Sequence, residues 1–132
     1  MKKTVAVIGS SGAIGSAFCK SLLEDHSIEK VYKFARNNID KDSDNEINIS
    51  IDIEDEDSIK KAIEEVPEDT RFDLIFVATG ILHNDNNIFP EKSIKDISID
   101  KLKKVFMVNT FGPTLLGKFF IPYLNKEKSV FA

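Results

Sequence analysis

Three glycines, spaced three residues apart, follow the first apolar run of the chain. The run, Thr4 to Ile8, is rich in β-branched residues and has no polar alternation, which is typical of a strand covered on both faces. Gly9, Gly12 and Gly15 come next, and a segment with helical spacing of apolar residues continues to Glu24. A strand, a glycine turn and a helix in this order predict a unit of a parallel α/β sheet.

The rest of the chain continues the same alternation. Apolar or alternating runs predict strands at residues 4–8, 30–35, 47–53 and 72–78, and a further strand from residue 128. Helical spacing predicts helices at residues 16–24, 55–65 and about 98–125, and Ile14, Phe18 and Leu22 define one apolar face of the first. This order predicts a Rossmann-like, doubly wound parallel sheet with right-handed crossovers.

Composition excludes several other classes of protein. The 132 residues carry 22 acidic and 18 basic side chains, a balance that argues against a general nucleic-acid partner. One cysteine excludes a disulfide framework and a zinc finger, and we predict no metal site. No apolar run approaches the ~20 residues that a bilayer requires, so no membrane partner is predicted. We expect a cytoplasmic protein.

The glycine turn predicts a site for a pyrophosphate. The first glycine permits a tight turn, the middle one lets a phosphate approach the backbone, and the third allows close packing of helix on sheet. N–H groups at the helix start then hold the anion, whereas a P-loop is excluded because no Gly-Lys-Ser/Thr follows. The alternative is a glycine-rich turn without a ligand. The residues predicted to bind a pyrophosphate-containing cofactor here are Gly9, Ser10, Ser11, Gly12, Ala13, Ile14 and Gly15.

The end of the second predicted strand bears on the choice of cofactor. Binding of NAD usually requires an acidic residue there, but Ala35 takes that place and is followed by Arg36 and Asn37. The fork of donors on an arginine can pair with a 2′-phosphate. We therefore predict NADP rather than NAD, with Arg36 and Asn37 in the site. The alternative is a solvated surface arginine.

Several short motifs, taken in order, resemble the short-chain dehydrogenase/reductase family. They are the glycine turn, Asp52-Ile53 at the end of the third predicted strand, Val77-Ala78-Thr79-Gly80 at the end of the fourth, and Asn109 in Val108-Asn109-Thr110-Phe111-Gly112-Pro113. The resemblance covers essentially the whole chain and is nearest to small C-factor-like reductases. Two features depart from the family. The glycine spacing fits its extended branch, and Ala78 and Thr79 replace the usual Asn and Ala.

The resemblance implies an enzyme that transfers hydride between NADP(H) and a small carbonyl compound or alcohol, as a homodimer or homotetramer. It implies that Asp52 and Ile53 contact the adenine, that Ala78, Thr79 and Gly80 line the cofactor site, and that Asn109 is catalytic through a water-linked proton relay. The residues themselves add that Pro113 cannot donate to the carbonyl of Asn109, which predicts a kink in the helix.

The rest of the family's catalytic set is missing from the sequence. Tyr32 lies in the second predicted strand, and Tyr123 has Glu127 where the family has Lys, so neither matches the family's acid. We therefore expect residues 1–132 to be the N-terminal portion of one Rossmann domain, with four to five strands, truncated in the fifth. The chain alone is expected to be inactive and to associate. The alternatives are a non-catalytic NADP-binding sensor or regulatory module and an extended-branch, epimerase-like relative.

Overall fold

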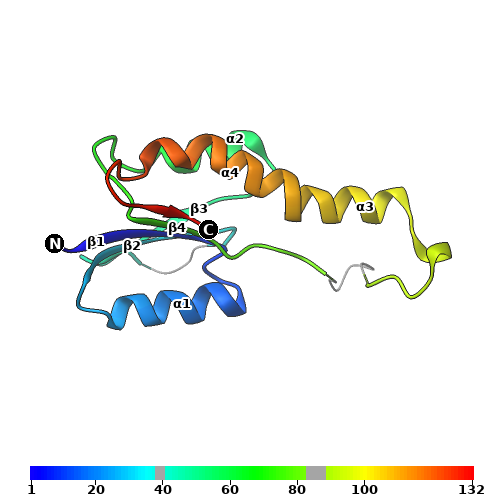
Figure 1. Ribbon diagram of the computed structural model, residues 1–132, viewed down its shortest axis with the longest axis horizontal. Coiled ribbons are helices and arrows are strands. Elements are labelled where there is room, and N and C mark those ends of the chain that lie inside the picture. Colours follow the sequence, from blue (N-terminus) through cyan, green and yellow to red (C-terminus); the bar gives the residue numbers. More distant parts are fainter. Residues whose placement is uncertain (38–40, 83–88) are drawn as a thin grey trace.

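The computed structural model describes residues 1–37, 41–82 and 89–132, which contain one parallel sheet (Figure 1). Its strands follow the order β3-β2-β1-β4-β5, and every neighbouring pair is parallel. The strands are β1 (Lys3–Ile8), β2 (Ile28–Ala35), β3 (Glu46–Ser50), β4 (Leu74–Val77) and β5 (Val130–Phe131). The predicted α/β class and Rossmann-like sheet are thus confirmed.

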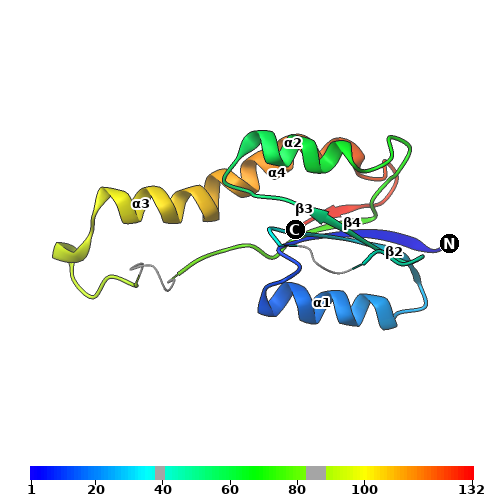
Figure 2. The same cartoon turned by 180° about the vertical axis from the view of Figure 1, so that it is seen from behind.

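Helices cover both faces of the sheet. α1 (Ala13–Glu24) lies on one face, and α2 (Glu56–Glu64) and α4 (Gly112–Phe120) lie on the other, as Figures 1 and 2 show from opposite sides. The side chains of β1 alternate between them, so that Val5 and Val7 join the cluster under α1 while Ala6 and Ile8 join the other. A central strand buried on both faces explains the continuous apolar run of the sequence.

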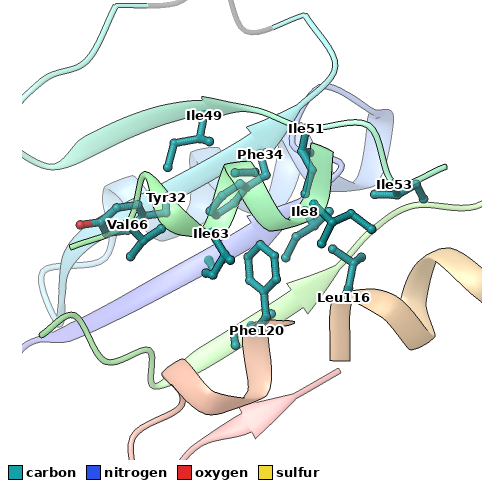
Figure 3. Close-up of a cluster of buried hydrophobic side chains, with 14 of the residues drawn as sticks. Ile8, Tyr32, Phe34, Ile49, Ile51, Ile53, Ile63, Val66, Leu116 and Phe120 are labelled. Atoms are coloured by element: carbon teal, nitrogen blue, oxygen red, sulfur yellow. The ribbon is translucent and has the colours of Figure 1, made fainter. Parts of the chain in front are cut away.

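The larger core cluster lies between the sheet and the α2/α4 layer. Figure 3 shows Phe34 of β2 and Phe120 of α4 directed toward each other, and their ring centroids are 5.1 Å apart in an edge-on arrangement. Leu116, one turn earlier in α4, is also fully buried. These contacts fix α4 across the sheet, and they anchor the C-terminal part of the long predicted helix.

That predicted helix, 98–125, is present as a run of shorter segments. They are α3 (Ile99–Phe106), a π-helical turn η2 (Met107–Phe111), α4, and a short 3-10 helix η3 (Ile121–Tyr123); another 3-10 turn, η1 (Ile94–Asp96), precedes them. Ser98 caps α3 by accepting a hydrogen bond from the Lys101 N–H. Directly before Pro113, the Gly112 N–H donates to the carbonyl of Met107, five residues back. The helix therefore accommodates the proline through a π-turn.

Two details differ from the sequence prediction. The buried face of α1 consists of Gly15, Cys19 and Leu22, whereas Ile14 is 69% exposed. Compared with the predicted orientation, α1 is turned about its axis so that Gly15 faces the sheet. Gly15 lies against the Gly9 carbonyl, where an added Cβ would come within 2.0 Å of the oxygen. The third strand ends at Ser50 rather than at residue 53, because the carboxylate of Asp52 accepts the Glu54 N–H and closes a turn.

The helices of the described ranges are too short or too polar to span a membrane.

Candidate functional site

A cavity of about 630 Å³ lies at the carboxyl ends of β1, β2 and β4 and beside the turn after β3. This is the edge at which open parallel sheets bind ligands. Its lining brings together four segments that are far apart in sequence: the glycine turn, Arg36, the turn at Asp52 and Ile53, and the segment from Ala78 to Gly80. Lys104 and Val108 of the long helix complete the wall.

The glycine turn has the conformation that its sequence predicts. Gly9 has φ +84°, a left-handed conformation that favours glycine, and a Cβ there would meet the Thr79 side chain at 2.9 Å. The N–H groups of Gly9 and Ser10 donate to the Phe34 carbonyl and so tie the turn to β2. Near Gly12, in contrast, the closest atom to an added Cβ is the Gly9 oxygen at 3.5 Å, which leaves room for a ligand on the other side.

The start of α1 supplies backbone donors beside this turn. Gly12 is its N-cap and provides no side-chain hydrogen bond, and N–H groups at such a helix start are of the kind that hold anions. Among the predicted residues of the turn, Gly9, Ser11 and Gly12 line the cavity. Ala13 and Ile14 are exposed at the helix start, Gly15 is buried against Gly9, and Ser10 faces a separate hollow beside α1.

Arg36 and Asp52 lie at the end of the cavity formed by β2 and β3. Arg36 is exposed and lines the cavity, and its carbonyl accepts a hydrogen bond from the Ser50 hydroxyl. The Asp52 N–H donates to the Ser58 hydroxyl, which holds the turn against the start of α2. Ile53 is buried next to it and also lines the cavity. Asn37 is exposed and is not among the lining residues.

The segment after β4 is held by Asn109 of the long helix. The Ile81 N–H donates to Asn109 Oδ1 and Asn109 Nδ2 donates to the Ile81 carbonyl, each at 2.7 Å. Ala78, Thr79 and Gly80, which precede Ile81, line the cavity, but Asn109 does not. Asn109 therefore acts in this structure as the residue that fixes the loop wall.

An ion pair at the cavity, between Lys104 and Glu54, was not predicted from the sequence. Lys104 Nζ lies 2.6 and 2.7 Å from the two carboxylate oxygens of Glu54. The two residues are 50 positions apart, and no local motif joins them. The available signal was that Glu54 directly follows Asp52-Ile53, while Lys104 lies just over one helical turn before Asn109.

The hollow beside α1 has a different character. It measures about 420 Å³ and is lined by α1, by the two serines after Gly9 and by Lys33 of β2. Cys19 lies in its wall, and burial raises the pKa of this thiol to about 11, so it is protonated and unreactive at neutral pH. Within the described ranges, no three His, Cys, Asp or Glu side chains are grouped as metal ligands.

Two buried hydroxyls near the glycine turn have no hydrogen-bond partner in the described part of the chain. They belong to Ser10, which directly follows Gly9, and to Thr79, whose methyl group would meet a Cβ added at Gly9. Buried polar atoms without a partner are uncommon in folded proteins and are typical of places where a ligand or water completes the structure.

The sequence model of the family described as short chain dehydrogenase matches residues 3–130. A search among curated proteins found no match. Among solved structures, a short chain dehydrogenase family protein from Francisella tularensis is 25% identical with a TM-score of 0.79, over 99% of this chain and 50% of that one. The KRED1-Pglu enzyme is 26% identical with a TM-score of 0.82, over 98% and 55%.

An NADPH-bound carbonyl reductase from chicken fatty liver shares the fold. It is 24% identical with a TM-score of 0.77, over 92% of this chain and 48% of that one. The chain thus spans about half the length of these solved structures.

Proposed function

Since this chain belongs to the short-chain dehydrogenase family, we propose that residues 1–132 form the NADP(H)-binding part of an oxidoreductase that acts on a small carbonyl compound or alcohol. The observation that carries the proposal is one cavity at the carboxyl ends of parallel strands, in which the glycine turn, Arg36 and Asp52 meet. The bound cofactor would supply or accept the hydride. The residues of this chain would bind and orient it.

Each wall of the cavity has chemistry that suits part of a dinucleotide. The free N–H groups at the start of α1 and the open space at Gly12 suit a pyrophosphate. The Arg36 guanidinium suits a 2′-phosphate, and the turn at Asp52 and Ile53 suits the adenine. The unpartnered Thr79 hydroxyl is the kind of buried polar atom that a bound molecule would satisfy.

In this proposal Asn109 supports the wall of the cavity that follows β4. Its side chain holds Ile81, and with it the segment Ala78 to Gly80, against the cofactor cavity. Its carbonyl cannot receive a hydrogen bond from Pro113, which has no N–H. We propose that this carbonyl holds a water of the proton relay in the complete enzyme, whose remaining catalytic groups would lie outside residues 1–132.

The cofactor preference is tested by titrating the chain with NADPH and with NADH. Arg36→Ala should weaken NADPH binding at least tenfold, because it removes a charge-assisted contact worth about 1.5–3 kcal/mol, and should change NADH binding less than about twofold. Arg71→Ala is the matched control, since the Arg71 guanidinium donates to the carbonyls of Glu68 and Thr70 outside the cavity. Unchanged NADPH affinity in Arg36→Ala refutes the preference for NADP. If wild type binds neither dinucleotide, the cofactor site itself is refuted.

We also propose that the protein acts as a homodimer or homotetramer in which a second copy covers α3. Leu102 and Phe106 expose large apolar side chains on this helix, and Phe111 continues the exposed apolar surface into η2. Apolar side chains gathered on one surface are typical of a protein interface.

A further inference from the structure

The Lys104–Glu54 ion pair connects α3 to the turn after β3 at the edge of the cavity. Both oxygens of the carboxylate lie within hydrogen-bond distance of the ammonium group. The side chains are 37% and 23% exposed, so the pair is partly shielded from water. Both residues line the cavity, together with Asp52 and Ile53.

The side chains of α3 contribute little burial that would hold this helix in position. None of its side chains is buried, and Figures 1 and 2 show that it extends beyond the edge of the sheet. An isolated helix of this length is unstable in water, so its position depends on its links to the rest of the fold. Two such links are η2, which continues the helix toward α4, and the Lys104 side chain.

Glu54 in turn is coupled to the residues expected to meet the adenine. Its N–H donates to Asp52 Oδ1 at 3.0 Å, so the position of Glu54 and that of the Asp52 carboxylate depend on each other. Without Lys104, Glu54 would place an unpaired carboxylate close to that of Asp52. Such a cavity wall would repel the phosphates of a dinucleotide.

We propose that Lys104 is a positioning residue for the adenine end of the cofactor site. By pairing with Glu54 it holds α3 against this end and neutralises a carboxylate that would otherwise oppose an anionic adenine dinucleotide. The role in ligand binding rests on the proposed function. The docking of α3 does not, because it can be measured without any ligand.

A second ion pair of the same kind supplies the control. Lys118 of α4 lies 2.7 Å from Glu56 of α2, so it also links the long helix to the segment after β3. This pair is more exposed, at 61% and 50%, and neither residue lines the cavity. Comparison of Lys104→Met with Lys118→Met therefore separates the effect of the cavity from that of any lost ion pair.

The first experiment measures amide hydrogen exchange in the ligand-free chain. Lys104→Met should accelerate exchange over residues 99–106 at least about threefold, because α3 loses its tether, whereas Lys118→Met should leave these residues unchanged. If exchange over 99–106 is the same in wild type and Lys104→Met, the proposed docking role is wrong, whatever the chain binds.

The second experiment measures NADPH affinity by calorimetric titration. Lys104→Met should weaken binding about tenfold, and Lys118→Met less than about twofold. The exchanged pair, Lys104→Glu with Glu54→Lys, should restore affinity to within about threefold of wild type, because the link and the net charge return. Unchanged affinity in Lys104→Met overturns the role in cofactor binding. A failure of the exchanged pair also overturns it, because Lys104 would then contact the ligand itself. Absence of NADPH binding by wild type would instead refute the proposed function.

Discussion

The two halves of the long helix have the same apolar spacing but different surroundings. In α4, Gly112, Leu116 and Phe120 are buried against the sheet, and the helix lies beside α2. In α3, Leu102 and Phe106 have comparable spacing, and yet no side chain of this helix is buried. Only one of the two halves lies over the sheet (Figure 1).

This difference shows that amphipathic spacing predicts which face of a helix is apolar, but not which part of a structure will cover that face. For α4 the partner is the core of the same chain, and its burial contributes to folding. For α3 the structure offers an ion pair at one side and leaves the apolar side open. The π-turn between the halves marks the change from a structural helix to one that borders the cavity.

The largest expected effect is a difference in stability between two variants, each of which truncates one phenylalanine in one half of the helix. Phe120→Ala should lower the free energy of unfolding by about 3–5 kcal/mol, because the ring is fully buried against Phe34 and its removal leaves a cavity. Phe106→Ala should change it by less than about 0.5 kcal/mol, since that side chain is 50% exposed. Urea denaturation at low protein concentration measures both. Equal losses would remove the distinction between the halves.

A smaller effect is expected at the junction of the halves. Asn109→Leu deletes both hydrogen bonds to the Ile81 backbone and should cost about 1–3 kcal/mol of stability. The Ile81 amide should also lose its protection from hydrogen exchange. Asn109→Asp is the control, because it keeps the acceptor for the Ile81 N–H and should retain part of that protection. Full protection of the Ile81 amide in Asn109→Leu would show that the loop is held by other contacts.

The sequence predicted most of the fold because the deciding signals are local. The run Thr4 to Ile8 and the glycines after it identify a buried strand and a turn at the start of a helix without reference to any other segment. The order of elements then allows few topologies, since right-handed crossovers are strongly favoured. The same signals placed Arg36 and Asp52 at strand ends, and parallel strands bring those ends to one edge.

What the sequence did not predict depends on contacts that residue spacing does not specify. The exposure of Ile14 follows from the close approach of Gly15 to Gly9, which rotates α1 on the sheet. The Lys104–Glu54 pair joins residues that no spacing rule connects. Periodicity alone also could not show that α3 projects beyond the sheet, because this depends on where the strands end.

The exposed face of α3 leads to a prediction about association. If a second copy covers it, Phe106→Gln should weaken self-association at least about tenfold, because a large exposed apolar side chain of the proposed contact becomes polar. Ile14→Gln, at an exposed apolar position of α1 on the other face of the sheet, is the control and should leave association unchanged. Analytical ultracentrifugation over a range of concentrations measures it. A wild-type chain that stays monomeric at every concentration would contradict the prediction.

The smallest expected effect tests how much α4 depends on an ion pair at its surface. Lys118→Met removes the contact with Glu56 and also the position of the ammonium over the Phe119 ring, 4.9 Å from its centroid. Because Lys118 and Glu56 are well exposed, water and salt screen the pair, and the loss of unfolding free energy should stay within about 1 kcal/mol. It should shrink further in concentrated salt, as measured by urea denaturation at two ionic strengths. A larger, salt-independent loss would mean that α4 depends on its surface charges as well as on its buried face, and the contrast with α3 would then be one of degree.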